Sequence, residues 1–484
     1  MAGVDAIEVG FSVSDGDDSL SIVDSYEVDD SISVSETGVA NAQTPAMSNN
    51  RVVQGSGDAD MTQVYSSESY SVQNNVYALG SHGLYLRTGA TMTPCYFDLS
   101  QSLDLSGGQS RYVLSGDYFG EGVLQYAGVT RGVLTSSQSL TFSDGIYSSQ
   151  NIAARGLNPR AFASAGQFRF DPITGEILGS GGFVGLGVLG MGQISGLLQA
   201  NTVVGQPSTT AVSGSNLDAR TRDLAFVTAG AGDVEGNLND GQIDVQGAAA
   251  VGGVVNGRFT GDISAVNERE VSLPSCAPPA GPLDPRASIN LVGRGDLAFE
   301  GAAAGDVELD APRGTLEAQG ALVGAGAAKD ASVQGSMYAM TDGEYSSAGG
   351  TGIRAGGDAM AATGAASGNV RADWSTGTFE GEAALVGAGA AGQNSVVQAG
   401  MLDVGTGSAF AYGSDIMARG DEFALAAVGA GNLMFNPKRL RGEGALFGVG
   451  AGENGRVDAA FLSAGTMVFW TYTRGEGISA RGDD

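Results

Sequence analysis

Polar and apolar residues alternate along much of the chain with a period of two. In the segment from Thr378 to Glu382 (TFEGE), one parity is polar and the other is Phe or Gly. Such alternation is typical of a strand with one buried face. Turn-like dipeptides such as Asp240-Gly241 and Asp342-Gly343 separate the apolar runs. Near the N-terminus the apolar residues also keep to even positions, at Leu20, Ile22, Tyr26, Val28, Ile32 and Val34.

Glycine supports the same assignment. It makes up 79 of 484 residues, and each Gly inside a helix costs about 1 kcal/mol relative to Ala. Runs such as Ala384 to Ala391 (ALVGAGAA) consist mostly of Gly and Ala, and such small side chains permit flat, closely stacked sheets. We therefore expect an all-β fold of two stacked, extended sheets of β-arches or hairpins, solenoid-like and open-ended. The glycines expected to give tight sheet packing are Gly324, Gly326, Gly387, Gly389, Gly448 and Gly450.

Two markers recur with a period of about 62 residues. The first is an Arg-Gly node, and successive nodes are separated by 62 to 74 residues. The second is a Gly/Ala run that follows each of the first five nodes by 26 to 28 residues. Because the two markers keep a nearly constant distance from each other, they predict a repeated supersecondary unit. The node arginines could pair with Asp or Glu of a neighbouring repeat or subunit. The nodes lie at Arg155, Arg220, Arg294, Gly356, Arg419 and Arg481.

The markers divide the chain into three parts. Residues 1–76 form an acidic segment rich in Ser and Asp, which we expect to be part strand and part flexible. Residues 77–150 form a divergent first repeat, and residues 151–484 form five repeats of about 62 residues. The long gap between the second and third nodes has a local cause, because residues 271–286 hold five of the twelve prolines. This stretch predicts a loop inserted into one copy.

The charge balance excludes one class of partner. The net charge is −29, with 24 Lys and Arg against 53 Asp and Glu. Binding of nucleic acid needs basic residues to neutralise phosphates, and an anionic membrane surface would repel this chain. The apolar run of residues 181–198 reaches the length of a membrane span, but it is one copy of the repeat, so we expect no membrane insertion. The N-terminus lacks the basic segment of a signal peptide, so we expect a mature start or an unconventional export route.

Residues for chemistry are scarce. His82 is the one histidine, and without a second His or a nearby Cys it predicts neither a catalytic nor a metal site. Two G-x-G-x-x-G matches, from Gly185 and from Gly387, lie in the Gly/Ala runs and precede no helix. Acidic clusters leave calcium possible but unsupported, since no EF-hand loop fits. Cys95 and Cys276 could form a disulfide within or between chains, or stay unpaired. We expect no enzyme activity and no cofactor.

The Arg-Gly-Asp tripeptide occurs three times, at Arg294, Arg419 and Arg481. Such tripeptides can act as adhesion ligands, but all three coincide with nodes, so a structural role is favoured. An outer-membrane barrel is disfavoured because aromatics make up only 7% and no aromatic girdle recurs with the repeat.

The acidic composition and the GALVGAGA-type runs at 320–327, 383–390 and 444–451 resemble the tubular sheath proteins of filamentous methanogenic archaea. The resemblance covers roughly residues 150–484 and implies an extracellular, amyloid-like subunit of the cell envelope that assembles with copies of itself. We therefore predict a structural subunit that polymerises through its sheet edges into a protective sheath or surface layer. The alternative is a β-solenoid adhesin or surface-layer binding protein.

Overall fold

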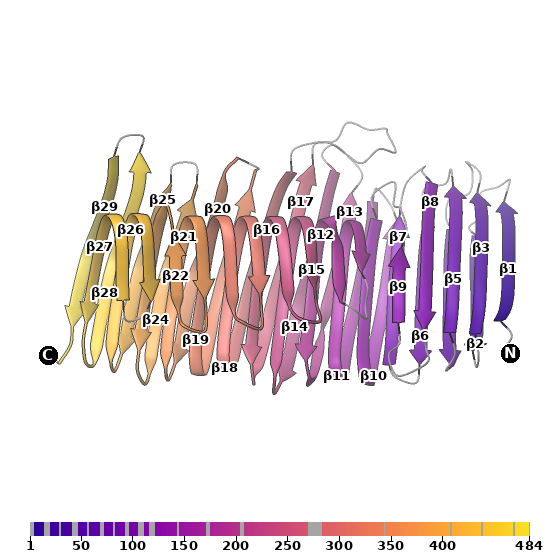
Figure 1. Ribbon diagram of the computed structural model, residues 1–484, viewed down its shortest axis with the longest axis horizontal. Helices are drawn as coiled ribbons and strands as arrows, with labels where there is room; N and C mark the ends of the chain where they lie inside the picture. Colours follow the sequence, from indigo (N-terminus) through magenta and orange to yellow (C-terminus); the bar gives the residue numbers. More distant parts are fainter. Residues whose placement is uncertain are drawn as a thin grey trace.

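The fold is all-β, as predicted from the alternation and the glycine content. The computed structural model describes residues 4–13, 20–28, 31–40, 47–55, 58–67, 72–80, 83–91, 96–104, 111–115, 122–142, 145–170, 175–203, 208–269, 283–342, 344–406, 409–436, 439–467 and 470–483, and it describes the side chains of most but not all of these residues from 123 onward. The described residues contain no helix and form 29 strands stacked along one long axis (Figure 1).

The first nine strands alternate mainly between two sheets. Strands β1, β3 and β5 pair in parallel in one sheet, while β2, β4 and β6 pair in parallel in the other. Consecutive strands therefore form arches here, and the pairing turns antiparallel from β7 and β8 onward. The strands are β1 (Val4–Val13), β2 (Leu20–Val28), β3 (Ser31–Ala40), β4 (Met47–Gly55), β5 (Asp58–Ser67), β6 (Val72–Gly80), β7 (Gly83–Thr91), β8 (Tyr96–Asp104) and β9 (Arg111–Ser115).

From β10 onward the chain is an antiparallel meander of long strands, most of which bend at a corner near the middle. Some cross the corner unbroken, as β18 does, and others are divided by it, as β14 and β15 are. The strands are β10 (Gly122–Phe142), β11 (Gly145–Phe170), β12 (Glu176–Leu189), β13 (Met191–Val203), β14 (Ser208–Thr221), β15 (Leu224–Asn237), β16 (Gln242–Val255), β17 (Arg258–Arg269), β18 (Leu283–Asp310), β19 (Thr315–Thr341), β20 (Ser346–Gly357), β21 (Met360–Asp373), β22 (Thr378–Gly381), β23 (Ala384–Ala391), β24 (Ser395–Gly405), β25 (Phe410–Gly420), β26 (Phe423–Asn436), β27 (Arg439–Ala451), β28 (Gly455–Met467) and β29 (Trp470–Arg481).

The two sheets expected to stay separate are joined in the middle of the molecule. Strands β11 and β18 each pair with different neighbours in their two halves, so eight strands close into a ring in the order β11-β12-β15-β16-β18-β17-β14-β13. This closure corrects the expectation of a simple open-ended pair of sheets. After β19 the halves separate again, one through β21 to β27 and the other through β20 to β29.

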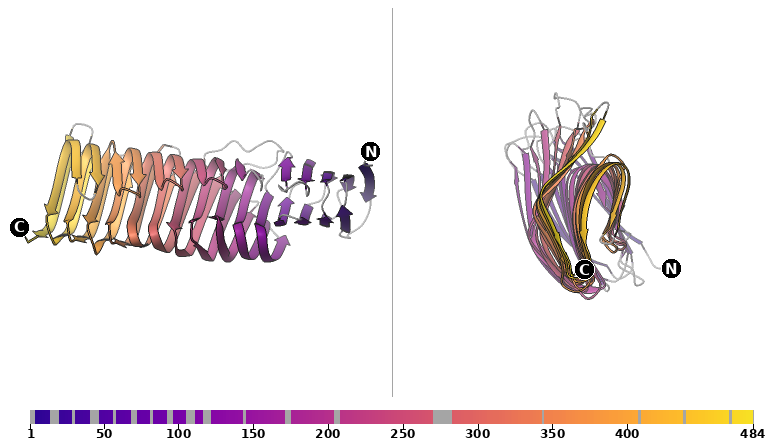
Figure 2. Two further views of the ribbon diagram at one scale, coloured as in Figure 1. Left: turned by 60° about the horizontal axis from the view of Figure 1, so that its bottom comes forward. Right: turned by 90° about the vertical axis from the view of Figure 1, so that its left-hand side faces the viewer.

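A second bend gives three layers. At this bend glycines lie opposite one another on neighbouring strands, as Gly232, Gly247, Gly305 and Gly320 do. We name the layers as they lie in Figure 1: the front layer lies beyond these glycines, the middle layer between the glycines and the corners, and the rear layer beyond the corners. The end-on view in Figure 2 shows the chain curling back on itself in this way.

Each space between layers holds its own core. The rear and middle layers enclose mainly Ala, Val and Leu, such as Val227, Ala302 and Val386. The middle and front layers enclose a core with large aromatic side chains, including Trp374 and Phe299, whose rings stack at a centroid distance of 6.5 Å. The middle layer is therefore covered on both faces. This is why consecutive residues in its Gly/Ala runs are all buried instead of alternating between buried and exposed.

Candidate functional site: strand edge, corners and charged rows

The strand β27 is an edge with the sequence of an interior strand. Among the described strands it pairs only with β26, so the backbone groups on its other side are unpaired. The leucine at the second position of each ALxGxGA run reveals the difference: Leu322 and Leu385 are 0% exposed, but Leu446 in β27 is 40% exposed. The segment from Ala445 to Gly450 thus resembles a buried strand that lacks one neighbour. Strand β29 is the corresponding edge of the rear layer.

The glycines expected to give tight packing mostly lie against large side chains. A Cβ added at Gly324 would overlap the Trp374 ring, and one at Gly326 would lie 3.1 Å from Trp374 Cβ. At Gly387 the nearest ring is that of Phe435, and Gly389 is buried in β23. In the edge strand, Gly448 lies against Leu440 and Gly450 against Phe423. These glycines therefore make room for the aromatic and leucine side chains of the second core.

The nodes lie at the corners between the rear and middle layers. Arg155, Arg220, Arg294 and Arg419 are exposed and come within a few residues of such a corner, and Gly356 takes the same place in β20. Arg481, also exposed, ends β29. The described ion pairs join other arginines, such as Arg258 to Asp218 and Arg371 to Glu317. Pairing of the node arginines with a neighbouring subunit stays a prediction.

The aspartates of the three Arg-Gly-Asp tripeptides belong to a network between adjacent corners. The side-chain amide of Asn256 donates to Asp296 at 3.0 Å, that of Asn394 to Asp421 at 3.5 Å and that of Asn454 to Asp483 at 2.6 Å. All three asparagines have positive φ, between 47° and 55°, which Asn tolerates better than most residues. These contacts give the aspartates a structural role at the corners.

An arginine row crosses the outer face of the rear layer. Arg220, Arg258 and Arg294 lie directly opposite one another on β14, β17 and β18. A second triplet, Arg419, Arg456 and Arg481, does the same on β25, β28 and β29. Only the middle arginine of each triplet has an ion pair within the described part of the chain.

The middle arginine of each triplet is held by one aspartate. Arg258 donates to both carboxylate oxygens of Asp218, at 2.8 and 2.5 Å, and Arg456 donates to those of Asp458 at 2.8 and 3.0 Å. Each aspartate raises the pKa of the arginine that it accepts from. The two outer arginines of each triplet remain available to an anion.

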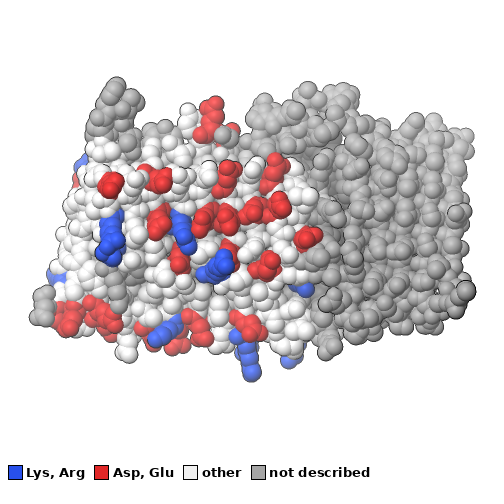
Figure 3. All heavy atoms as spheres, viewed as in Figure 1, with Lys and Arg blue, Asp and Glu red and all other residues white. Residues whose placement is uncertain are grey.

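An acidic row crosses the front layer on the opposite side of the molecule. Glu235, Asp244, Glu308 and Glu317 lie directly opposite one another on four neighbouring strands. Arg371 ends the row with an ion pair to Glu317 at 3.3 Å. Partial burial and the neighbouring Glu235 raise the pKa of the Asp244 carboxyl. Acidic side chains form a belt across this face (Figure 3), along a shallow groove of about 1100 Å³.

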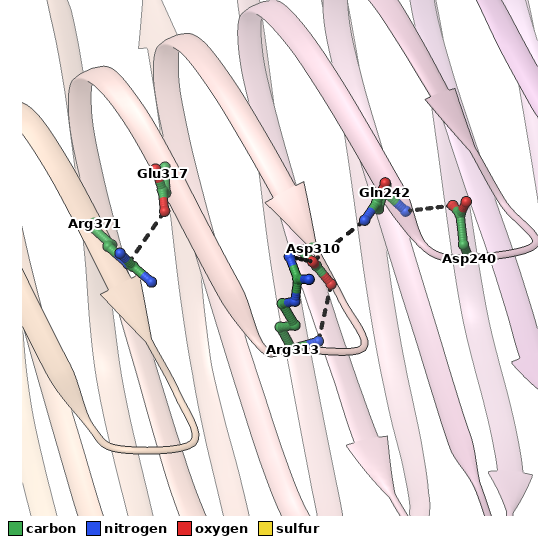
Figure 4. A network of polar contacts seen from close by, with 6 residues as sticks. All are labelled: Asp240, Gln242, Asp310, Arg313, Glu317 and Arg371. Carbon is green, nitrogen blue, oxygen red and sulfur yellow. Dashed lines mark hydrogen bonds and ion pairs between the residues drawn. The ribbon is translucent and has the colours of Figure 1, made fainter.

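The turns below the acidic row are fixed by a further polar network. Asp310 accepts hydrogen bonds from the Arg313 backbone at 3.0 Å and from the Gln242 side chain at 3.5 Å, and Arg313 also pairs with it at 3.0 Å (Figure 4). Asp240 accepts from the Gln242 backbone at 3.2 Å. These contacts hold the front-layer hairpins in register and leave the acidic row facing outward.

The remaining predicted positions lie outside the described residues or within strands. Cys95, Cys276 and His82 lie outside the described residues, as do residues 271–282 of the expected insertion, whereas residues 283–286 begin β18. Both G-x-G-x-x-G matches lie in or at the ends of strands, in β12 and β23. Within the described residues no group of three or more His, Cys, Asp or Glu side chains could hold a metal ion. The same residues contain no helix that is long and apolar enough to span a membrane.

No protein-family model matches the sequence, and a search of the curated proteins finds no match. The candidate site therefore has to be interpreted from its own geometry.

Sequence reasoning missed Arg258 and Arg456, which complete the arginine triplets. Each follows an Asn-Gly pair, in Asn256-Gly257-Arg258 and in Asn454-Gly455-Arg456, so the tripeptide was a usable signal. The acidic row was missed because its members come from strands whose partners the sequence did not specify. Glu300, a carboxyl that is 0% exposed in the core between the rear and middle layers, was missed as well.

Proposed function

We propose that this protein is a structural subunit that assembles with copies of itself, through its strand edges, into a protective extracellular sheath or surface layer. The observation that carries the proposal is the exposure of Leu446 beside its buried counterparts Leu322 and Leu385. A neighbouring strand along β27 would bury this leucine and pair the free backbone groups. Unprotected edges of this kind template pairing with another chain.

The direction of the strands supports growth along one axis. The strands lie across the long axis, and their hydrogen bonds therefore run along it (Figure 1). A copy added at the β27 and β29 edges would extend the hydrogen-bonded sheets along the same axis. At the other end, β1 and β2 each pair with one described strand only, so a second pair of edges is present there. Repeated addition would give a solenoid-like, open-ended polymer.

The middle-layer half of the edge strand also lacks the usual protection, whereas its front-layer half carries Arg439, Arg441 and Glu443. Natural edges are shielded by Pro, by inward-pointing charges or by bulges. Between Ala445 and Ala451 strand β27 carries neither Pro nor a charged residue. Phe447 and Val449 on this strand pack only partly against the core. This apolar, regular edge is suited to a second copy of the chain.

A single substitution at the edge tests the proposal. Leu446→Lys places a charge where the next strand would lie, and we expect it to prevent growth. The control is Leu178→Lys, because Leu178 is 54% exposed but sits in β12, which is paired on both sides. Negative-stain microscopy and fibre diffraction should show ribbons or tubes with a spacing of about 4.7 Å along the growth axis for the unchanged chain and for the control. A monodisperse monomer at high concentration would contradict the proposal.

A protective extracellular role makes a second demand. Backbone engaged in a continuous sheet is inaccessible to proteases, so assembled material should resist digestion and detergent under conditions that degrade the Leu446→Lys variant. Antibody labelling of intact cells should reach the protein without permeabilisation. Labelling that requires lysis would contradict the location.

A further inference from the structure

The arginine row has an unfavourable arrangement within one chain. Like charges directly opposite each other on neighbouring strands destabilise a sheet, yet Arg220, Arg258 and Arg294 take such positions. Asp218 neutralises Arg258 only. Each triplet therefore presents two guanidinium groups without an ion pair to any described residue, on an exposed face, and an external anion would relieve the repulsion.

On the opposite face, the acidic row brings negative charges together as the arginine row brings positive ones together. Glu235, Asp244 and Glu308 are exposed and directly opposed. Only the end of the row, at Glu317, is neutralised by Arg371. An external cation or a basic surface would relieve this repulsion.

The two rows are carried by the same long strands. Arg220 and Glu235 lie on β14 and β15, the two parts of one long strand, and Asp244 and Arg258 lie likewise on β16 and β17. Arg294 and Glu308 both lie on β18. Neighbouring strands are about 4.8 Å apart in any sheet, so the charges of both rows repeat with the same spacing, one per strand.

We propose that copies of the chain stack face to face, with the arginine row of one copy against the acidic row of the next. The partner is thus a second copy, and the contact is distinct from growth at the strand edges. The stacking proposal rests on the proposed function in one respect, namely that both contacts join copies of this chain. Because the two surfaces differ, the contact is heterologous, and with the layers of successive copies parallel it continues without closing. Edge growth would then give ribbons, and face stacking would add further ribbons in layers.

Charge reversal tests the stacking. Arg220→Glu with Arg294→Glu reverses the charge at the outer positions of the first arginine triplet, and Asp244→Arg with Glu308→Arg reverses it in the middle of the acidic row. Either pair alone should abolish multilayers while single ribbons persist, and the four changes together should restore them. Lys329→Glu is the control, since this exposed corner lysine belongs to neither row. Fluorescence of Trp374, buried in the second core, shows whether each variant is folded.

Salt separates the two contacts. At about 1 M salt the Debye length falls to about 3 Å, so stacking should be lost while hydrogen-bonded ribbons remain. Microscopy measures ribbon length and layer number separately. The inference is overturned if either double variant forms as many layers as the unchanged chain. It is also overturned if the quadruple variant does not regain multilayers. If no ribbons form at all, the proposed function fails, while salt-sensitive face dimers in sedimentation velocity would still support the stacking.

Discussion

Gly232 and Gly247 face each other directly across β15 and β16, at the bend that separates the middle layer from the front layer. Their φ angles are +122° and +152°, and a Cβ on either residue would overlap the backbone on the other strand, at the carbonyl oxygen of Gln246 or Ala231. The bend that creates the aromatic core therefore requires residues without a side chain.

Gly232→Ala should consequently destabilise the fold. Positive φ costs an L-residue about 1–2 kcal/mol, and the overlap with the Gln246 carbonyl adds to this, so the free energy of unfolding should fall by about 2–4 kcal/mol. Urea denaturation followed by Trp374 fluorescence measures the change. Gly452→Ala is the matched control, because a Cβ there meets nothing within 4 Å. Equal stability of the two variants would show that the bend does not depend on glycine.

The corner asparagines allow a comparison at a single position. Asn256 has φ +47° and donates to Asp296. Asn256→Gly loses this hydrogen bond but tolerates the backbone angle, whereas Asn256→Ala loses the bond and strains the backbone as well. We expect the alanine variant to be less stable than the glycine variant by about 1 kcal/mol, in the same urea experiment. The reverse order would exclude backbone angle as the reason for Asn at this corner.

Periodicity predicted the strands well where one face is exposed and poorly where none is. Phe379 and Gly381 are buried and their neighbours are more exposed, as the alternation indicates. In the next strand, Ala384–Ala391, every residue is buried, because the front layer covers the face that a two-sheet arrangement would leave open. The sequence does contain the cause, namely the glycines that flank the runs, such as Gly247 and Gly320, but their role as a bend depends on their alignment across strands.

Strand direction and closure could not be predicted from local pattern. Parallel arches at β1–β6 and antiparallel strands later have the same period of two. The eight-strand ring exists because β11 and β18 cross the corner and pair with two neighbours each. That choice depends on partners more than ten residues away. The node residues, by contrast, lie close to corners, beside turn residues such as Asn256 and Asn454, while the repeat of about 62 residues stays a prediction.

Glu300 occupies a place where the corresponding strands carry apolar or small residues. It faces the core between the rear and middle layers, is 0% exposed, and neither carboxylate oxygen has a hydrogen-bond partner among the described residues. Burial raises the pKa of the Glu300 carboxyl well above its ordinary value of 4.5, and the nearby Leu291 backbone offsets this only in part. No charged group contributes to the shift.

The sign of the pH dependence follows from proton binding. Above pH 4.5 the carboxyl is ionised in the unfolded chain but stays protonated in the folded chain until the pH reaches its raised pKa. The folded state then binds one more proton than the unfolded state, so this residue makes the free energy of unfolding fall as the pH rises through that window. Below pH 4.5 the carboxyl is protonated in both states and contributes no slope.

Glu300→Val should therefore stabilise the protein, and more so at neutral than at acid pH. Val227 takes the equivalent position in β15 and is fully buried, so the valine fits the same core. We expect a gain of about 1–3 kcal/mol at pH 7 from removal of an unsatisfied buried polar group, shrinking towards pH 4. The measurement is urea denaturation of both chains between pH 4 and pH 8, with Glu317→Gln, a half-exposed carboxyl in the front layer, as the control. A difference between Glu300→Val and the unchanged chain that stays constant with pH would show that Glu300 is ionised alike in the folded and unfolded states.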